Sequence, residues 1–179
     1  SMLTLVMGMA VADACNELME GNMAGLKWPN DLVINGKKAA GTLTEMSAEL
    51  DCIHYVVIGT GINVNTREFP AELSQAISLR QAAGHSFRRA ELIALCMKYF
   101  ETYYGLFEQT EDLSLLKKDY DRLLVNTGRE VRVLEPGHEY TGTALGINRY
   151  GELQVRCEDG HVEEIYAGEV SVRGIYGYV

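Results

Sequence analysis

The strongest local constraint in this chain of 179 residues is a β-hairpin signal at Asn35-Gly36. A two-residue turn of type I′ requires positive φ at both central positions, and Asn-Gly meets this requirement at low cost. The apolar, β-branched run Leu32-Val33-Ile34 precedes the turn, and a small apolar stretch returns over residues 39–45. These residues predict two antiparallel strands, the first of them half-buried, joined by a tight turn.

The segment before this hairpin carries polar residues around a proline. Pro29 fixes its own φ and biases Trp28 toward an extended conformation, and the Asn30-Asp31 pair that follows is typical of turns. Pairing across the hairpin is expected to gather five side chains in one region. These are Lys27, Trp28, Asn30, Asp31 and Lys38. The same residues also admit an ordinary turn with a core tryptophan and two solvated lysines at the hairpin tip.

Composition limits the class of protein. With 47% hydrophobic residues, the chain can bury the core of one ordinary domain, or of one domain plus a small module. The formal net charge of −9 and the pI of about 4.9 do not provide the positive surface that nucleic-acid binders use. We therefore expect no nucleic-acid partner, and we expect basic residues to act individually within a site.

Cysteine and histidine usage gives no sign of a disulfide framework or a metal site. The four cysteines are far apart, without a Cys-x-x-Cys pair or a Cys/His cluster, and the histidines lack metal-ligand spacing. We predict buried free thiols in a reducing compartment and no zinc site formed by the cysteines and histidines. The residues are Cys15, Cys52, Cys96 and Cys157, with His54, His85, His138 and His161.

The longest apolar stretch, residues 3–12, is interrupted by Thr4 and Gly8. It is too short to span a bilayer, and it lacks the basic region and the cleavage site of a secretion signal. The sequence therefore predicts a soluble, cytoplasmic protein without membrane contact.

Helical periodicity begins with residues 3–20, where a polar face appears only in the second half. The apolar first half predicts burial on more than one side, by some other element of the protein. After the hairpin, Tyr55-Val56-Val57-Ile58 is apolar without alternation, which predicts a strand buried on both faces. Gly59 and Gly61 at its end let a ligand approach the backbone closely, which favours a site over a simple turn.

Three more helical stretches are expected, over residues 69–83, over 86–109 with Ser86 as the N-cap, and over 112–124. Near residues 125–128 the hydrophobic period changes from about 3.6 to about 2, which predicts a boundary between residues 1–125 and 126–179. Short strands separated by turn signals such as Pro136-Gly137 and Asp159-Gly160 then predict a small barrel. These strands are expected at residues 130–134, 140–147, 153–157, 162–166 and 169–173.

Three motifs occur in order along the chain. They are Lys27-Trp28-Pro29-Asn30-Asp31, Lys38-Ala39-Ala40-Gly41 and Gly59-Thr60-Gly61-Ile62-Asn63-Val64-Asn65. In their order and spacing the chain resembles the biotin–protein ligases, and the likeness runs through all 179 residues. The resemblance implies an α/β (α+β) fold, in which a mixed β-sheet with packed helices, truncated at its N-terminus, is followed by an SH3-like β-barrel. Asp159-Gly160-His161 and residues 168–171 match the turn and the final strand of that barrel.

For the activity, the resemblance implies a reaction in two steps. ATP, with Mg²⁺, activates biotin to biotinyl-5′-AMP, and a lysine of a carboxylase's biotin-carrier domain then attacks this anhydride. Because two anions meet in the first step, a fixed cation is needed between carboxylate and phosphate. The family's catalytic lysine falls on Lys38, with Lys27 in support. Asp31 is expected to orient the acceptor amine or to bind Mg²⁺ through water.

The resemblance assigns the remaining matched residues to substrate binding. Asn63 is expected to face the nucleotide, and Asn30 matches a residue near the nucleotide and the attacking amine. Trp28 belongs to the same binding motif as Asn30. The wall around biotin is expected from Gly41, Leu43, Gly59, Gly61 and Ile62.

The main departure from the family pattern concerns its Gly/Arg-rich loop, which closes over biotinyl-AMP. In this chain Gly-Arg occurs only at Gly128-Arg129, inside the predicted barrel. We therefore expect a fragment with weak or no ligase activity by itself. Two alternatives stay open, a non-catalytic binding or assembly module and a lipoate-type acyl transferase. An uncovered apolar helix and sheet edge also predict self-association into a homo-oligomer.

Overall fold

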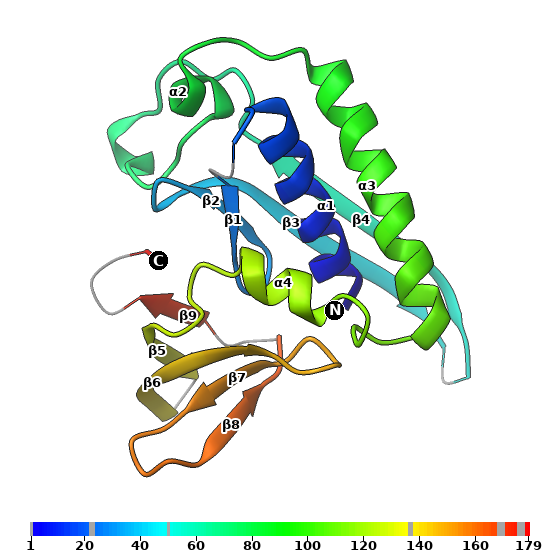
Figure 1. Cartoon of the computed structure of the whole chain (residues 1–179), viewed down its shortest axis with the longest axis vertical. Helices are drawn as coiled ribbons and strands as arrows, with labels where there is room; N and C mark the ends of the chain where they lie inside the picture. Colours follow the sequence, from blue (N-terminus) through cyan, green and yellow to red (C-terminus); the bar gives the residue numbers. More distant parts are fainter. Residues whose placement is uncertain (1, 22–23, 50, 136–137, 168–170, 175–177) are drawn as a thin grey trace.

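The computed structural model describes residues 2–21, 24–49, 51–135, 138–167, 171–174 and 178–179. It contains two antiparallel sheets, and helices cover one face of the first (Figure 1). The first sheet has the order β1-β2-β3-β4, from β1 (Ala24–Lys27), β2 (Asp31–Ile34), β3 (Lys37–Ala48) and β4 (Ile53–Ile62). The second has the order β8-β7-β6-β5-β9, from β5 (Glu130–Glu135), β6 (His138–Ile147), β7 (Leu153–Arg156), β8 (Val162–Ile165) and β9 (Ser171–Gly174). The helices are α1 (Met2–Leu18), α2 (Leu79–Ala83), α3 (Arg89–Thr110) and α4 (Lys117–Leu123), with a 3₁₀ turn η1 (Ala71–Leu73).

The predicted hairpin is confirmed as the β2–β3 turn. Asn35 and Gly36 have φ values of 52° and 72°, as a type I′ turn requires. The strand before the turn is buried throughout rather than half-buried. Its other edge pairs with β1, a strand that was not predicted from the sequence. β2 therefore lies inside the sheet, and its first residue is held in a buried position.

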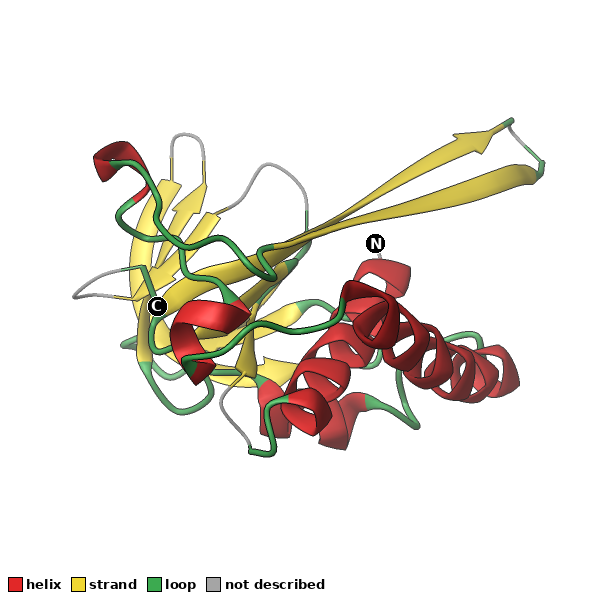
Figure 2. Ribbon diagram, turned by 90° about the horizontal axis from the view of Figure 1, so that it is seen from above, coloured by secondary structure: helices red, strands yellow, loops and turns green. Residues whose placement is uncertain are grey.

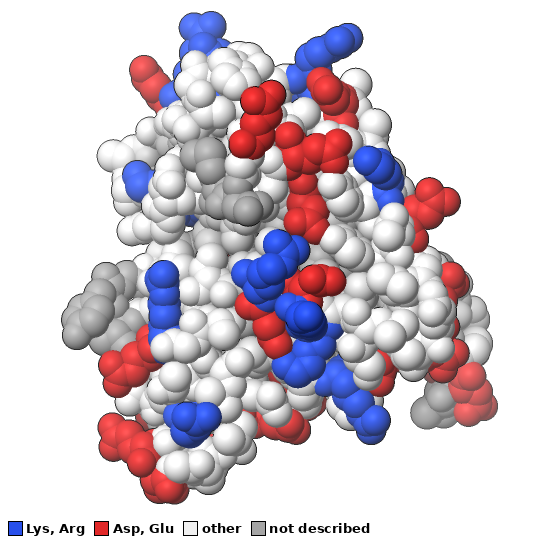
Figure 3. Space-filling model, in the orientation of Figure 1, with Lys and Arg blue, Asp and Glu red and all other residues white. Residues whose placement is uncertain are grey.

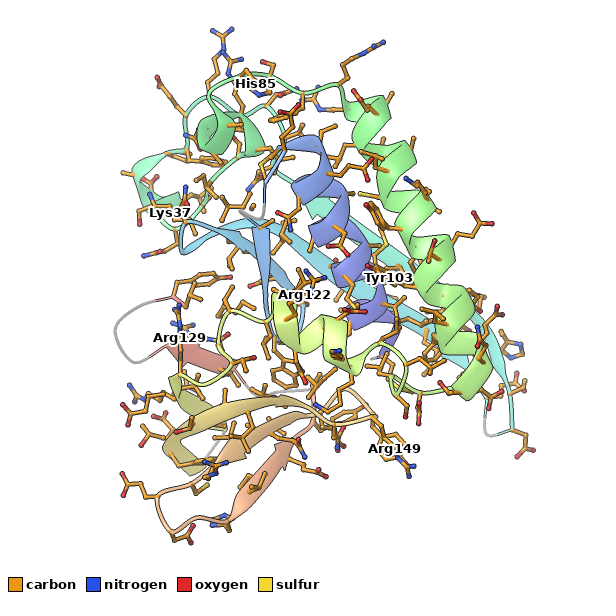
Figure 4. The ribbon with its side chains drawn as sticks, viewed as in Figure 1. Lys37, His85, Tyr103, Arg122, Arg129 and Arg149 are labelled. Atoms are coloured by element: carbon orange, nitrogen blue, oxygen red, sulfur yellow. The ribbon has the colours of Figure 1, made fainter. Side chains whose placement is uncertain are left out.

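Helix α1 lies between the first sheet and α3 (Figures 1 and 2). Its apolar first half is buried on more than one side, as predicted. The Thr4 hydroxyl group lies 2.7 Å from that of Thr44 in β3, and the Tyr103 hydroxyl group on α3 donates to Asp13 of α1 (Figure 4). The covering elements belong to this chain, so the expectation that this helix is uncovered is wrong. It no longer supports self-association.

The strand at the edge of the first sheet also differs from its prediction. In the described sheet β4 pairs with β3 on one side, and Tyr55 is 61% exposed, so the expected burial of both faces is wrong. Helix α1 covers one face of the sheet, while Leu43, Tyr55 and Val57 are exposed on the opposite face. An unbroken apolar run indicates a strand, but it does not reveal which neighbours cover it.

The stretch 69–83, predicted as one helix, forms η1 and α2 with non-helical chain between them. A capping box starts the second helix, because the Gln81 backbone N–H donates to Ser78 Oγ at 3.1 Å and Ser78 N–H donates to Gln81 Oε1 at 3.1 Å. Helix α3 begins later than predicted. Ser86 is not its N-cap, and its hydroxyl oxygen instead accepts a hydrogen bond from Arg80 at 3.1 Å.

The five strands expected in the second half are confirmed, and all of them pair antiparallel. The predicted turn at Pro136-Gly137 and the start of the last predicted strand, residues 169–170, lie outside the described residues. Among the described residues, parallel pairing is limited to isolated bridges of Leu26 with Leu124 and of Lys38 with Ala76. The predicted boundary falls between α4 and β5, and the division into residues 1–125 and 126–179 stays a prediction.

Acidic and basic side chains are mixed on the face shown in Figure 3. On α4, Lys117 pairs with Asp121 at 2.5 Å and Arg122 with Asp119 at 3.8 Å. These basic groups are therefore balanced by acidic neighbours on the same helix. Among the residues that the structure describes, no helix is both long enough and apolar enough to cross a bilayer.

Candidate functional site

A lysine and an aspartate from paired strands form the centre of the candidate site. Lys38 lies near the start of β3 and Asp31 begins β2, where the register places it opposite Gly41. Lys38 Nζ lies 2.5 Å from Asp31 Oδ1. The side chain of Lys38 is 43% exposed and that of Asp31 is 11% exposed. The site is thus a nearly buried carboxylate that holds an accessible cation.

Two glycines shape the surface around this pair. A Cβ atom at Gly41 would lie 3.1 Å from both Cε and Nζ of Lys38, so the absence of a side chain lets the lysine cross the strand. A Cβ atom at Gly61, which pairs with Gly41, would meet no atom within 4 Å. The surface over Gly61 is therefore open to a ligand.

The main chain of Lys38 is held from both sides. On one side it pairs with Val33 of β2. On the other side Lys38 N–H donates to the Gln75 carbonyl at 2.7 Å, and Ile77 N–H donates to the Lys38 carbonyl at 2.9 Å. The segment before α2 therefore runs beside β3 at this point, and movement of the ammonium group comes from the side-chain torsions of Lys38.

Tyr178, near the C-terminus, completes the site. Its hydroxyl group donates a hydrogen bond to Asp31 Oδ2, and Lys27 Nζ lies 4.3 Å from the centroid of its ring. Burial and the bond to Asp31 raise the pKa of Tyr178, so the phenol stays protonated. Burial lowers the pKa of Lys27 from its ordinary value, against the opposing effect of Asp31.

Sequence reasoning missed Tyr178. It is 147 positions from Asp31 in the chain, and it belongs to none of the three motifs. No spacing rule connects residues at such a distance, so only the packing of the C-terminal segment against the first sheet reveals it. Gln75 and Ala76 were missed for a related reason, because they meet Lys38 through backbone groups that carry no residue-type signal.

These groups border a cavity of about 490 Å³, a size typical of sites for small organic molecules. Four predicted binding residues lie on it together with Lys38, namely Gly41, Gly61, Ile62 and Asn63. The full lining consists of Lys38, Ala40, Gly41, Gly61, Ile62, Asn63, Phe69, Glu72, Leu73, Gln75, Ala76 and Tyr178.

Other predicted site residues lie outside this lining. Trp28 is 1% exposed, and its Nε1–H group donates to the Gly151 carbonyl at 2.9 Å, so its indole ring lies in the core. The Asn30 amide donates to the Thr42 carbonyl at 3.2 Å and fastens the loop to β3. Leu43 and Gly59 form an opposed pair on the open face of the sheet, next to the pair of glycines.

For Mg²⁺, the cavity offers Glu72 on its lining and Asp31 at its edge. Because Lys38 and Tyr178 already contact the two oxygens of Asp31, this carboxylate suits contact through water better than direct ligation.

Comparison with known proteins places the chain in a family. Residues 1–63 match the Biotin/lipoate A/B protein ligase family, and residues 127–173 match the Biotin protein ligase C terminal domain. The Bifunctional ligase/repressor BirA of Bacillus subtilis is 37% identical over 173 residues, which are 95% of this chain and 52% of that protein. The Escherichia coli protein of the same name is 30% identical, over 96% of this chain and 53% of its own length. The chain thus spans about half the length of these relatives.

Solved structures agree with the sequence comparison. The apo biotin protein ligase from Aquifex aeolicus has a TM-score of 0.85 and 31% identity, and the match covers 97% of this chain and 75% of that one. The complex of the A. aeolicus ligase with biotin and ATP has a TM-score of 0.83 and 30% identity, over 97% and 71% of the two chains. The fold predicted from the sequence is therefore confirmed, and the chain belongs to the biotin protein ligase family.

Proposed function

We propose that this chain carries the reaction site of a biotin–[acetyl-CoA-carboxylase] ligase. The reaction would activate biotin with ATP to biotinyl-5′-AMP and transfer it to a lysine of a biotin-carrier domain. The observation that carries the proposal is the accessible ammonium group of Lys38, 2.5 Å from Asp31 and beside a cavity whose floor at Gly61 is open. The A. aeolicus ligase, which was solved with biotin and ATP, supports it.

In the first step, the carboxylate of biotin attacks the α-phosphorus of ATP, and pyrophosphate leaves. Lys38 is a point charge with three donors, so it can contact the carboxylate and a phosphate oxygen and reduce their repulsion. To do so it gives up part of its contact with Asp31. The hydrogen bond from Tyr178 to Asp31 Oδ2 persists, so this nearly buried carboxylate keeps a partner.

In the second step, the amine of the acceptor lysine attacks the acyl carbon of biotinyl-AMP, and AMP leaves. The attacking amine loses a proton during this step. Asp31 Oδ1, once Lys38 has moved toward the phosphate, is the acceptor that we assign to orient this amine or take its proton. Asp31 is also the group that we assign to a water ligand of Mg²⁺.

The assignment of substrate regions follows the surface around Lys38. We assign biotin to the open sheet face made by the opposed pairs Gly41–Gly61 and Leu43–Gly59, with Ile62 beside them. We assign the nucleotide to the end of the cavity at Asn63. Three residues support the site from behind. These are Lys27 under the Tyr178 ring, Trp28 in the core and Asn30 on the loop.

The test measures binding rather than turnover. We expect turnover by the chain as given to be weak, because its one Gly-Arg pair, Gly128-Arg129, lies just before β5 and not beside this cavity. Titration calorimetry with biotin in the presence of ATP and Mg²⁺ should detect binding. Lys38→Gln should weaken it about tenfold or more, since a charged hydrogen-bonding group is lost.

Lys37→Gln is the matched control, because Lys37 is the exposed neighbour at the hairpin turn (Figure 4). We expect its affinity to stay within about twofold, as for an exposed side chain with no role in binding. Equal losses in the two variants would refute the role of Lys38. Absence of biotin binding in the unaltered chain would favour a non-catalytic module, and preference for lipoate over biotin would favour an acyl transferase.

A further inference from the structure

The β3–β4 hairpin projects from the body of the molecule (Figure 2). Its far end brings together a thiol, an imidazole and a carboxylate. Glu49, Cys52 and His54 each offer one ligand atom, and these atoms all lie within 4.8 Å of one another. Among the described residues, no other group of three histidine, cysteine or carboxylate side chains lies close enough together to hold a metal ion. Cys52 is exposed, so the prediction of buried thiols is wrong at this position.

A β-bulge explains how His54 reaches the other two residues. Ser47 and Ala48 pair with Tyr55 and Ile53, so His54 is an extra residue in β4. A bulge interrupts the alternation of side chains between the faces of a strand and redirects the extra one. This irregularity cannot be read from the spacing of cysteine and histidine alone.

Backbone and side-chain contacts then hold the three donors on one turn. Glu49 N–H donates to the Cys52 carbonyl at 2.9 Å and closes the chain around the turn. His54 Nε2 lies 3.3 Å from Glu49 Oε1, so the ring nitrogen and the carboxylate already face each other. Cys52 is exposed and carries a free thiol.

We propose that Glu49, Cys52 and His54 bind a divalent transition-metal ion of the zinc class. Thiolate, imidazole and carboxylate are the protein ligands that Zn²⁺ uses, whereas Mg²⁺ and Ca²⁺ require oxygen ligands. Three protein ligands leave the fourth tetrahedral position to a water molecule. The site therefore differs in chemistry from any Mg²⁺ that accompanies ATP.

The geometry requires little rearrangement. Tetrahedral bonds of about 2.0–2.3 Å place neighbouring ligand atoms about 3.3–3.8 Å apart. The donors, within 4.8 Å, therefore need to approach by about 1 Å, which exposed side chains achieve by rotation. Glu49 and His54 are 78% and 45% exposed, so no core packing opposes this movement.

The charge of the hairpin favours a cation. The sequence has no lysine or arginine between Lys38 and Arg67, so this end of the hairpin carries no basic side chain except His54. A thiolate and a carboxylate balance the two charges of the metal ion, and Asp51 adds another negative charge nearby. Binding would leave this end of the hairpin close to neutral.

The proposed site is separate from the reaction site. Glu49 is eleven residues beyond Lys38 along β3, which at about 3.3 Å per residue corresponds to about 36 Å. The metal would therefore fix the two strands at the end of the hairpin and take no part in the reaction. The proposal does not depend on the ligase function.

The experiment titrates the full chain, freed of metal with a chelator and kept reduced, with Co²⁺ alone. We expect one equivalent to bind and to produce the near-ultraviolet absorption of a cobalt–thiolate bond, which Zn²⁺ then abolishes by competition. Cys52→Ser should remove this absorption, and Glu49→Gln and His54→Gln should each weaken binding about tenfold or more. All three side chains are exposed, so the variants should retain the unaltered far-ultraviolet circular dichroism.

Cys157→Ser is the matched control. Cys157 is a partly exposed thiol close in sequence to Asp159 and His161, which contact each other, so it is the other cysteine with potential ligands nearby. Cys15 and Cys96 are buried. Burial raises the pKa of Cys96 to about 11 and also raises that of Cys15, so neither competes for the metal. Cys157→Ser should bind Co²⁺ as the unaltered chain does. Absorption lost in Cys157→Ser but kept in Cys52→Ser, or no thiolate absorption in the unaltered chain, would overturn the proposal.

Discussion

Replacing Trp28 by phenylalanine tests how strongly the two sheets depend on each other. The buried Nε1–H group of Trp28 donates to the Gly151 carbonyl at 2.9 Å, in the turn between β6 and β7. Phenylalanine leaves this carbonyl without its donor, which costs about 1–3 kcal/mol. The smaller ring also leaves ~40 Å³ unfilled, which at about 24 cal/mol per Å³ costs about 1 kcal/mol. We therefore expect Trp28→Phe to lower the free energy of unfolding by about 2–4 kcal/mol.

The assay is urea denaturation followed by far-ultraviolet circular dichroism. Trp28 is the only tryptophan of the chain, so its fluorescence cannot be compared between the two proteins. Tyr150→Phe is the control, because it removes an exposed hydroxyl group that contacts Arg149 in the same turn. We expect this control to change the free energy of unfolding by less than about 0.5 kcal/mol. An equally small change in Trp28→Phe would refute the inference that this bond couples the sheets.

Three further predictions concern the site, the packing and the second sheet. Tyr178→Phe removes the hydrogen bond to Asp31 but keeps the aromatic ring beside Lys27. We therefore expect the affinity for biotin in the presence of ATP to fall about fivefold, and unchanged affinity by calorimetry would contradict this. Gly25→Ala should lower the free energy of unfolding in urea by about 1–3 kcal/mol, since its Cβ atom would lie 2.4 Å from a valine side chain, whereas Gly105→Ala, with open space around it, should not destabilise the chain. Hydrogen bonds to two carboxylates raise the pKa of His161, so its stabilising contribution is complete below pH 6.5 and is lost as the pH rises through the folded-state pKa. In His161→Gln the melting temperature should therefore fall less steeply with rising pH over that range. Parallel curves of melting temperature against pH for the two proteins would argue against this.

Local chemistry explains which parts of the fold were predictable. The Asn35-Gly36 turn depends on two residues that tolerate positive φ, and this property is visible in the sequence. The capping box at Ser78 and Gln81 was equally visible, but the surrounding apolar residues suggested one longer helix. Local signals of this kind thus determine where an element begins. The prediction of one helix over residues 69–83 was wrong because it did not use the capping box.

The position of an element in the assembled fold was harder to predict. The apolar run in β4 indicates a strand, yet its exposed face depends on the sheet edge and on α1, which lie elsewhere in the chain. Lys38 and Asp31 were predicted together because they belong to one hairpin. Tyr178 was not predicted, because its contact with Asp31 joins residues 147 positions apart and depends on the packing of the whole chain.

The two hydrogen bonds that connect Lys38 with Gln75 and Ile77 have a consequence for the evolution and engineering of this protein. Surface connections usually tolerate insertions and deletions. Here, adding or removing a single residue between β4 and α2 would offer a different peptide group to Lys38 and shift its strand. We therefore expect the length of this connection to be as constrained as the identity of residue 38, because the contacts are made by backbone groups.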